Sequence, residues 1–243
     1  MGFRNSYEDD RLAAGYNELE LDGTYDLVFR NLPGLLALHV KGTRAVDFGC
    51  GTGRSARFLQ KLGFVTTGLD ISEEMVAIAR QRDPKGTYQI IDNGDFQTLP
   101  ANGFDLVLSA FAFDNIPGFD WKVQLFRGLG SLLAEGGILA NIVSTPEIYI
   151  HEWVSFSTRD YPKNRVAQCG DVVSIVATEL SDAGPVEDIL WPHEDYLRVY
   201  REAGLDVVLV ERPLATGDEG ITWQSETSVA PWAIYLLKQR VDA

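Results

Sequence analysis

The sequence holds little cysteine and little histidine, and this scarcity limits the metal chemistry it can support. Its 243 residues include two cysteines, Cys50 and Cys169, and three histidines. Neither cysteine belongs to a Cys-x-x-Cys pair or to a mixed cysteine and histidine cluster, so we expect neither a disulfide framework nor a zinc site. The sequence therefore predicts a protein without a metal, folded in a reducing compartment such as the cytoplasm.

Long apolar runs are also missing. Runs such as 45–48 and 234–237 are far shorter than the roughly 20 residues that cross a bilayer. The first ten residues, MGFRNSYEDD, lack the apolar core of a signal peptide. We therefore expect a soluble cytoplasmic protein that has no membrane partner.

Positive charge is scarce as well. The chain carries 21 Lys plus Arg against 35 Asp plus Glu, a formal net charge of −14. No basic run is long enough to follow a phosphate backbone, which argues against nucleic acid as a partner. Hydrophobic residues make up 45% of the chain and charged residues 23%, values that are typical of a globular protein and exclude a mainly disordered one.

From residue 45 onward, short apolar runs alternate with segments of helical period, as in βαβ units around a parallel sheet. Five buried strands are expected at 45–48, 65–70, 88–91, 104–110 and 137–143, and two closing strands in DVVLVE and PWAIYLLKQ. Between the fourth and fifth strands, Leu125, Leu129, Leu132 and Leu133 form one helical face, and we expect Gly136 and Gly137 to end that helix. The pattern predicts an α/β protein.

The alternation stops after the fifth strand for about 45 residues, which is longer than an ordinary connection. Within 146–191, the segments 172–180 and 185–191 have the pattern of a β-hairpin, so we expect a functional insertion that carries a small hairpin lid. The remainder divides into an N-terminal helical cap (1–40), a core (41–145), and a closing helix with two strands (192–243). Together these segments predict a single domain.

A glycine-rich turn, VDFGCGTGR at residues 46–54, follows the first strand and opens a helix. Its glycines let a ligand approach the backbone and the N–H groups of the helix start. The spacing is GxGxG, whereas the dinucleotide fingerprint GxGxxG would need a third glycine where Arg54 stands. Asp47 would repel a pyrophosphate and attract an ammonium group. The turn therefore favours a nucleoside with an amino-acid tail over a dinucleotide.

Two further acidic positions follow the next strands. Asp70 ends the strand 65–70, where a carboxylate can accept both hydroxyls of an adenosine ribose. Asp95 and Phe96, after the third strand, offer an acceptor for an adenine amine beside an apolar surface, and Ile71 and Met75 would cover the other face of the ring. The sequence thus predicts an adenosine site along the ends of the first three strands.

In this order and spacing, DFGCGTG, LDISEEM, GDFQTLP and FDLVLSAFAFDNIP resemble the successive motifs of class I S-adenosylmethionine-dependent methyltransferases that act on small molecules. The resemblance covers roughly residues 40–145. It implies S-adenosylmethionine as the cofactor. It also implies a Rossmann-like sheet of seven strands in the order 3-2-1-4-5-7-6, with the seventh strand antiparallel and helices on both faces.

The resemblance also implies roles for single residues. The turn would surround the methionyl end of the cofactor, Asp70 would hold the ribose, and the end of the fourth strand would line the floor near the sulfonium. Tyr16, in the N-terminal segment, would close over the cofactor. The expected cofactor-binding set is Asp47, Gly49, Cys50, Gly51, Gly53, Asp70, Ile71, Met75, Asp95, Phe96, Ser109, Ala110, Phe111 and Tyr16.

Catalytic candidates are fewer, because methyl transfer is an in-line displacement that depends on positioning and needs a base only when a proton must leave. His151 in the insertion is a candidate base, with a solvated loop histidine as the alternative. Asp114 and Asn115, after the fourth strand, either orient the acceptor or form an ordinary turn.

Two groups of residues in the insertion bear on the acceptor. The aromatic residues either wall a pocket or pack the hairpin onto the core; they are Tyr149, Trp153, Phe156, Tyr161 and Trp191. Three basic residues concentrate positive charge and would attract a carboxylate or a phosphate; they are Arg159, Lys163 and Arg165. The acceptor is therefore expected to be anionic or aromatic.

The sequence thus predicts an enzyme, a monomer or a homodimer, that transfers a methyl group from S-adenosylmethionine to an oxygen, nitrogen or carbon nucleophile of a small molecule. Two alternatives stay open at this point. One is an NAD(P)-dependent oxidoreductase on the same fold, and the other is a protein that binds S-adenosylmethionine without transferring its methyl group.

Overall fold

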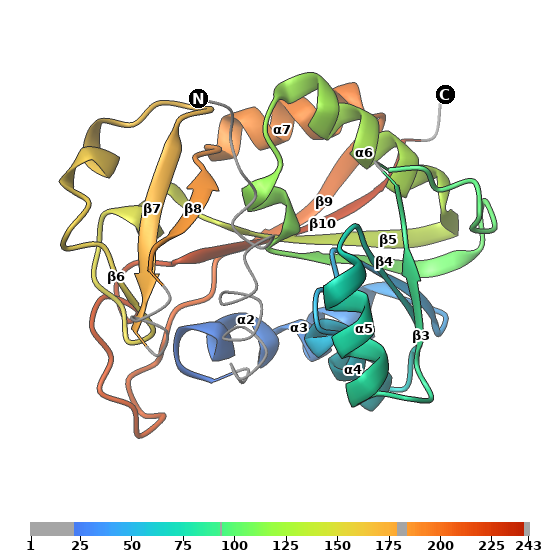
Figure 1. Ribbon diagram of the computed structural model, residues 1–243, viewed down its shortest axis with the longest axis horizontal. Helices are drawn as coiled ribbons and strands as arrows, with labels where there is room; N and C mark the ends of the chain where they lie inside the picture. The colour runs from blue at the N-terminus through green and yellow to red at the C-terminus, as the bar shows by residue number, and fades with distance from the viewer. Residues whose placement is uncertain (1–21, 93, 179–183, 241–243) are drawn as a thin grey trace.

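A seven-stranded sheet forms the centre of the computed structural model, which describes residues 22–92, 94–178 and 184–240 (Figure 1). Its strand order is β3-β2-β1-β4-β5-β10-β9. The strands are β1 (Arg44–Phe48), β2 (Val65–Asp70), β3 (Thr87–Ile90), β4 (Phe104–Ala110), β5 (Leu133–Ser144), β9 (Leu205–Glu211) and β10 (Trp232–Gln239). Strand β10 is antiparallel to both β5 and β9, and the other pairs are parallel. The predicted Rossmann-like sheet, order and antiparallel seventh strand are confirmed.

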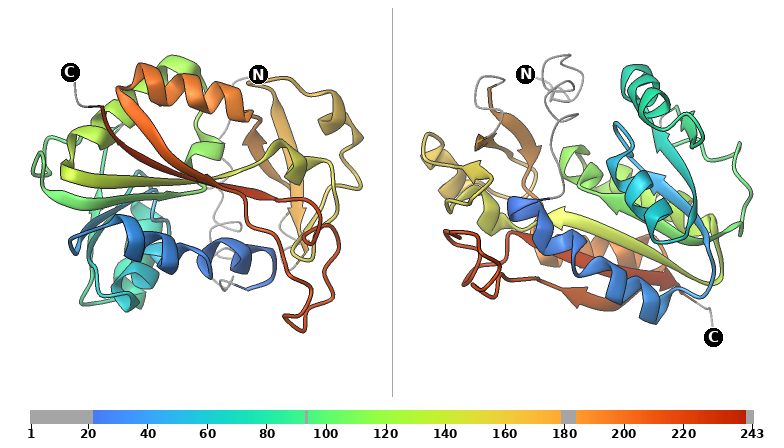
Figure 2. Two further views of the ribbon diagram at one scale, coloured as in Figure 1. Left: turned by 180° about the vertical axis from the view of Figure 1, so that it is seen from behind. Right: turned by 90° about the horizontal axis from the view of Figure 1, so that it is seen from below.

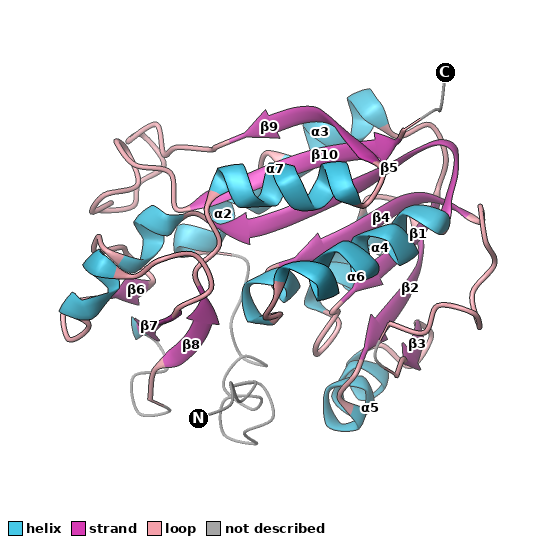
Figure 3. Cartoon of the chain, turned by 90° about the horizontal axis from the view of Figure 1, so that it is seen from above, coloured by secondary structure: helices cyan, strands magenta, loops and turns pink. Residues whose placement is uncertain are grey.

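Helices cover both faces of this sheet, because successive side chains of a buried strand point to opposite faces. In β4, Val107 packs into a cluster with Phe126 of α6 (Phe119–Ser131) and Tyr200 of α7 (His193–Glu202). Its neighbour Leu106 packs into a second cluster with Leu36 of α3 (Leu32–His39). Accordingly, α6 and α7 lie on one face (Figure 3), and α2 (Asp26–Phe29) and α3 lie on the other (Figure 2).

Two more helices flank β2 and β3. Helices α4 (Arg54–Lys61) and α5 (Glu73–Arg82) contribute Ala56 and Val76 to a small cluster that includes Tyr88 of β3. Helix α5 begins after Ser72, whose hydroxyl accepts the N–H of Met75 at 3.2 Å, so this serine is the cap that the sequence predicts.

The insertion forms a separate three-stranded antiparallel sheet beside the end of β5 (Figure 1). It contains β6 (Phe156–Ser157), β7 (Val172–Ala177) and β8 (Val186–Ile189), with 3-10 helices η4 (Pro146–Tyr149) and η5 (Pro162–Val166). The predicted hairpin is therefore confirmed as β7 and β8. The two-residue strand β6 has no detectable pattern in the sequence.

The boundary between α6 and β5 lies earlier in the chain than predicted. Helix α6 ends at Ser131, and Leu133 already pairs with Phe104 of β4 instead of continuing the helix. Strand β5 then bulges, so that the next pair is Leu106 with Ile138, and Gly136 takes a left-handed φ of 73° within the bulge. Leu132 and Leu133 fit the helical period because both are buried, and burial alone does not distinguish a last helical turn from a first strand residue.

Within the ranges that the structure describes, no helix is long and apolar enough to span a membrane.

Candidate active site

The glycine-rich turn joins β1 to α4 at the carboxyl end of the parallel strands. Gly49, Gly51 and Gly53 have positive φ angles of 71°, 51° and 80°. A Cβ on Gly51 would meet no atom within 4 Å, whereas a Cβ on Gly53 would lie 2.8 Å from the Tyr88 hydroxyl. Gly51 therefore leaves room for a ligand at the backbone, and Gly53 is needed for packing.

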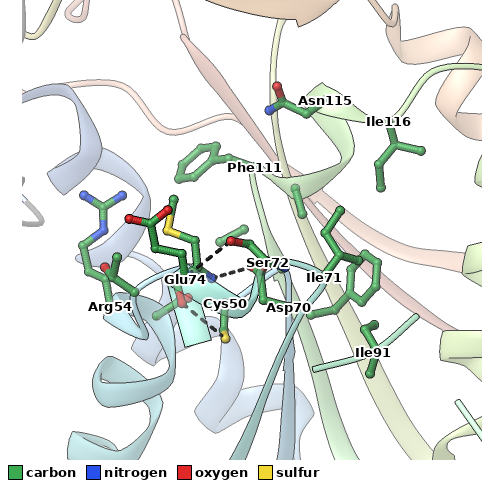
Figure 4. A pocket seen from close by; sticks show the side chains of 18 of the residues that line it. Cys50, Arg54, Asp70, Ile71, Ser72, Glu74, Ile91, Phe111, Asn115 and Ile116 are labelled. Carbon is green, nitrogen blue, oxygen red and sulfur yellow. Dashed lines mark hydrogen bonds between the residues drawn. The ribbon is translucent and has the colours of Figure 1, made fainter. Parts of the chain in front are cut away.

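A cavity of about 460 Å³ lies against this turn (Figure 4). Its volume is within the usual range of small-molecule sites. Eight of the expected cofactor-binding residues line it: Gly49, Cys50, Gly51, Asp70, Ile71, Met75, Ala110 and Phe111. Residues that are far apart in the sequence thus meet at the carboxyl ends of β1, β2 and β4, where ligands bind in open α/β sheets.

Asp70, the last residue of β2, presents its carboxylate to the cavity. Its two oxygens accept N–H groups from Gly51 at 2.8 Å and from Ser72 at 2.9 Å (Figure 4). Burial raises the pKa of Asp70, and these backbone hydrogen bonds oppose that rise. Each carboxylate oxygen can accept a further hydrogen bond, so Asp70 can hold a pair of ligand hydroxyls.

The chain is similar to known methyltransferases. Residues 45–137 match the family described as a methyltransferase domain. The chain is 28% identical to N-demethylindolmycin N-methyltransferase from Streptomyces griseus, over 77% of this chain and 79% of that protein. It is 26% identical to trans-aconitate 2-methyltransferase from Variovorax paradoxus, over 79% of this chain and 70% of that protein. A crystal structure of a S-adenosylmethionine-dependent methyltransferase from Clostridium acetobutylicum has the same fold, with a TM-score of 0.65 at 16% identity over 96% of this chain and 99% of that one.

The matches in sequence and in fold support a class I S-adenosylmethionine-dependent methyltransferase. Its cofactor is S-adenosylmethionine, and the residues of the cavity fit that molecule. Asp47 does not line the cavity; it lies fully buried next to the turn, where its Oδ2 accepts the Ser55 hydroxyl at 2.6 Å. Its Oδ1 has no hydrogen-bond partner among the described residues, and burial raises the pKa of Asp47 to about 7. The ammonium group of a methionyl tail is the kind of partner that this carboxylate lacks.

Several expected cofactor residues do not line the cavity of the methyltransferase. Asp95 is exposed, and its Oδ1 accepts the N–H of Gln97 at 3.0 Å. Phe96 is buried against Phe48, with ring centroids 6.0 Å apart. Ser109 is completely buried within β4. The adenine contacts of Asp95 and Phe96 therefore stay a prediction, and Tyr16 lies outside the described residues.

His151 lies in a second cavity, of about 470 Å³, within the insertion. This cavity shares no lining residue with the first. The His151 ring meets the Trp153 ring edge-on at 6.0 Å, and the nearby Arg159 lies 3.6 Å from the Glu152 carboxylate. The role of His151 as a base stays a prediction, although nothing in this geometry brings it to the cofactor cavity.

Asp114 is buried behind the cofactor cavity, in the 3-10 helix η3 (Ala112–Asn115) that follows β4. Its carboxylate accepts the Ser144 hydroxyl at 2.8 Å and the Ser144 N–H at 3.0 Å, and burial raises its pKa. Lys122 is equally buried, with its ammonium 4.8 Å from the Trp191 ring, and burial lowers its pKa. Asp114 does not line the cavity, so its role in orienting the acceptor stays a prediction.

The cavity also contains residues that sequence reasoning missed. Tyr25 and Phe29 line it from the segment before β1, and Arg54 and Glu74 line it from the first turns of α4 and α5. The Arg54 guanidinium lies 4.7 Å from the Tyr25 ring centroid. Residues in the first turn of a helix that follows a ligand-binding turn are expected to lie near the ligand. This rule could have identified Arg54, which the sequence analysis used only as the residue that replaces the third glycine of the dinucleotide fingerprint.

The aromatic residues of the insertion do not line the cofactor cavity. Four of them are buried in the hydrophobic core: Tyr149, Trp153, Phe156 and Trp191. They attach the insertion to the sheet, so the cofactor cavity is lined by other residues.

Proposed function

We propose that the protein transfers the methyl group of S-adenosylmethionine to a small-molecule acceptor, with the cofactor in the cavity of about 460 Å³. The observation that carries this proposal is the position of Asp70 at one part of the cavity and of Phe111 and Asn115 at another (Figure 4). The cavity thus has a part suited to the cofactor ribose and a separate part for an acceptor.

When bound, the cofactor supplies an electrophilic methyl group on a sulfonium centre. Asp70 would orient the ribose, the turn at Gly49 and Gly51 would hold the methionyl end, and Ile71 and Met75 would contact the adenine. Tyr25 and Phe111, whose ring centroids lie 5.5 Å apart, would shield the transfer point from water. In such a site, alignment of donor and acceptor supplies most of the acceleration.

Three observations support a small acceptor. The two relatives described above act, by their names, on N-demethylindolmycin and on trans-aconitate, which are both small molecules. The net charge of −14 opposes binding to nucleic acid. The part of the cavity around Phe111, Ala112 and Ile116 is apolar, which suits the body of a small organic molecule.

The test is methyl transfer to a panel of phenols, amines, carboxylates and carbon acids, with isotope-labelled methyl followed by mass spectrometry. We expect a labelled product from at least one class, and loss of that product in an Asp70→Asn variant. Labelling of protein or nucleic acid with no labelled small molecule would contradict the proposal, provided that S-adenosylhomocysteine binding confirms a folded protein.

A further inference from the structure

The second cavity, of about 470 Å³, lies in the insertion, whose segments are held in place there by buried side chains. Asn164 of η5 is buried, and its Nδ2 donates a hydrogen bond to the carbonyl oxygen of Tyr149 at 2.9 Å. Thr158 is buried as well, and its hydroxyl donates to the carbonyl oxygen of His151 at 3.0 Å. Tyr149, His151 and Thr158 all line the cavity. These hydrogen bonds fix the shape of the cavity before a ligand binds, which lowers the entropic cost of binding.

Two arginines give this cavity positive charge in a chain whose net charge is −14. Arg159 and Arg165 both line it, and both are exposed to solvent. Glu152 is the one acidic residue among the lining residues that the structure describes. The guanidinium groups therefore outnumber the carboxylates of the lining, and this charge attracts an anion.

Glu152 leaves the N–H groups of Arg159 available to a ligand. Its carboxylate accepts the Ser157 hydroxyl at 2.9 Å and the Thr158 N–H at 2.8 Å. One guanidinium nitrogen of Arg159 lies 3.6 Å from this carboxylate, a distance that is longer than a hydrogen bond. Within the described part of the chain, the Arg159 guanidinium therefore makes an ion pair but donates no hydrogen bond.

Further hydrogen-bond donors line the cavity. Arg165 donates one N–H to the carbonyl oxygen of Ile150 at 3.0 Å, and a guanidinium carries five such groups. The hydroxyls of Tyr161 and Ser225, which are also lining residues, have no hydrogen-bond partner in the described ranges. A ligand with several acceptor oxygens would pair with these donors. A carboxylate or a phosphate presents two oxygens at the spacing that a guanidinium fits.

We propose that the second cavity binds a small organic molecule through a carboxylate or phosphate group, which Arg159 and Arg165 contact. Both groups are oxyanions, and either forms charge-assisted hydrogen bonds with the two arginines. This cavity and the cofactor cavity have no lining residue in common, so a ligand here leaves the cofactor in place. The cavity is therefore an additional binding site, and it does not depend on which acceptor the enzyme methylates.

The test measures the binding of three small probes to the protein saturated with S-adenosylhomocysteine, by fluorine NMR titration. The probes 4-fluorobenzoate and 4-fluorophenyl phosphate each carry an oxyanion, and 4-fluorobenzamide is a neutral compound of similar size. The titrations are made in about 0.15 M salt, where charges more than about 8 Å apart are largely screened. We expect at least one oxyanion probe to bind about fivefold more tightly than the amide, since ion pairs at exposed groups are weak. The tighter oxyanion probe then identifies the ligand group as carboxylate or phosphate.

Arginine variants test whether this preference arises in the second cavity. Arg159→Ala and Arg165→Ala should each reduce it, and the double variant should abolish it without changing the affinity for the amide. Lys163→Ala is the matched control, because Lys163 also lies in η5 and is exposed but does not line the cavity. This control removes the same charge and should keep the preference within about twofold of wild type. Melting temperatures check that each variant is folded.

Three results would overturn the proposal. The first is that neither oxyanion probe binds the wild-type protein more tightly than the amide does. The second is that the double variant keeps the full preference, since the probes would then bind elsewhere. The third is an equal loss in Lys163→Ala, which would mean that overall charge, and not the cavity, attracts the anion. Failure to bind S-adenosylhomocysteine would overturn the proposed function alone, because the same titrations can be made without the cofactor.

Discussion

Replacement of Gly51 by alanine should weaken cofactor binding much more than it weakens the fold. At its φ of 51° an alanine is allowed but strained, at a cost of about 1 kcal/mol. The new methyl group would meet no protein atom within 4 Å, so no steric clash adds to this cost. For a chain of this size, 1 kcal/mol corresponds to a fall in melting temperature of roughly 2–4 °C.

The same methyl group would occupy the space in which the cofactor approaches the turn. Displacing a bound ligand from the backbone loses at least one well-formed polar contact, so we expect a 10- to 100-fold rise in the Kd for S-adenosylhomocysteine, or about 1.4–2.8 kcal/mol. Isothermal titration calorimetry measures this affinity, and differential scanning fluorimetry measures the melting temperature.

Gly204→Ala is the matched control. Gly204 follows α7, has a φ of 79°, and would also place its Cβ in open space, but it does not line the cavity. Its replacement should lower the melting temperature by a similar amount and leave the affinity within about twofold of wild type, a change of less than 0.5 kcal/mol. Equal cofactor affinity in both variants would refute the position assigned to the ligand at the turn.

Three further predictions follow from the carboxylates and from His151. Asp70→Asn should weaken S-adenosylhomocysteine binding about tenfold or more, because a charged acceptor is lost, as calorimetry would show. Burial raises the pKa of Asp47 to about 7 in the folded protein. Between its ordinary pKa and this value, Asp47 loses its proton in the unfolded chain but keeps it in the fold, so the free energy of unfolding of the cofactor-free protein falls by up to about 4 kcal/mol as the pH rises. The melting temperature should therefore fall from about pH 5 to pH 8, and by less in Asp47→Asn. His151→Ala tests the role of His151 as a base from its place in the second cavity: a general base contributes 10²-fold or more, so a fall in kcat of less than about tenfold would contradict that role.

The cofactor end of the site was open to prediction because its determinants are local. A strand, a glycine turn and a capped helix lie within a short segment, and Gly51 and Asp70 come together wherever two adjacent parallel strands end. Asp95 shows the limit of this reasoning. Its distance along the chain fits an adenine contact, but its Oδ1 accepts from Gln97 in an exposed turn, and such local hydrogen bonds are not visible in the spacing of motifs.

The burial of Lys122 behind the cavity could not be predicted, for a different reason. The helix that contains Lys122 is predicted from the spacing of its apolar residues. A lysine in such a helix is expected at the surface. In the structure it is completely buried, with Trp191 at 4.8 Å from its ammonium, because α6 packs against residues that follow β8. Only the tertiary arrangement brings these segments together, so no local signal marks Lys122 as buried.

Contacts within the insertion join the 3-10 helix η4 to strand β8. Strand β5 leads into η4, which carries Tyr149, and β8 returns Asp188, whose carboxylate accepts the Tyr149 hydroxyl at 3.0 Å. The cofactor turn takes no part in these contacts. Changes in β8 or η4 should therefore leave the geometry of Asp70 and Gly51 unchanged.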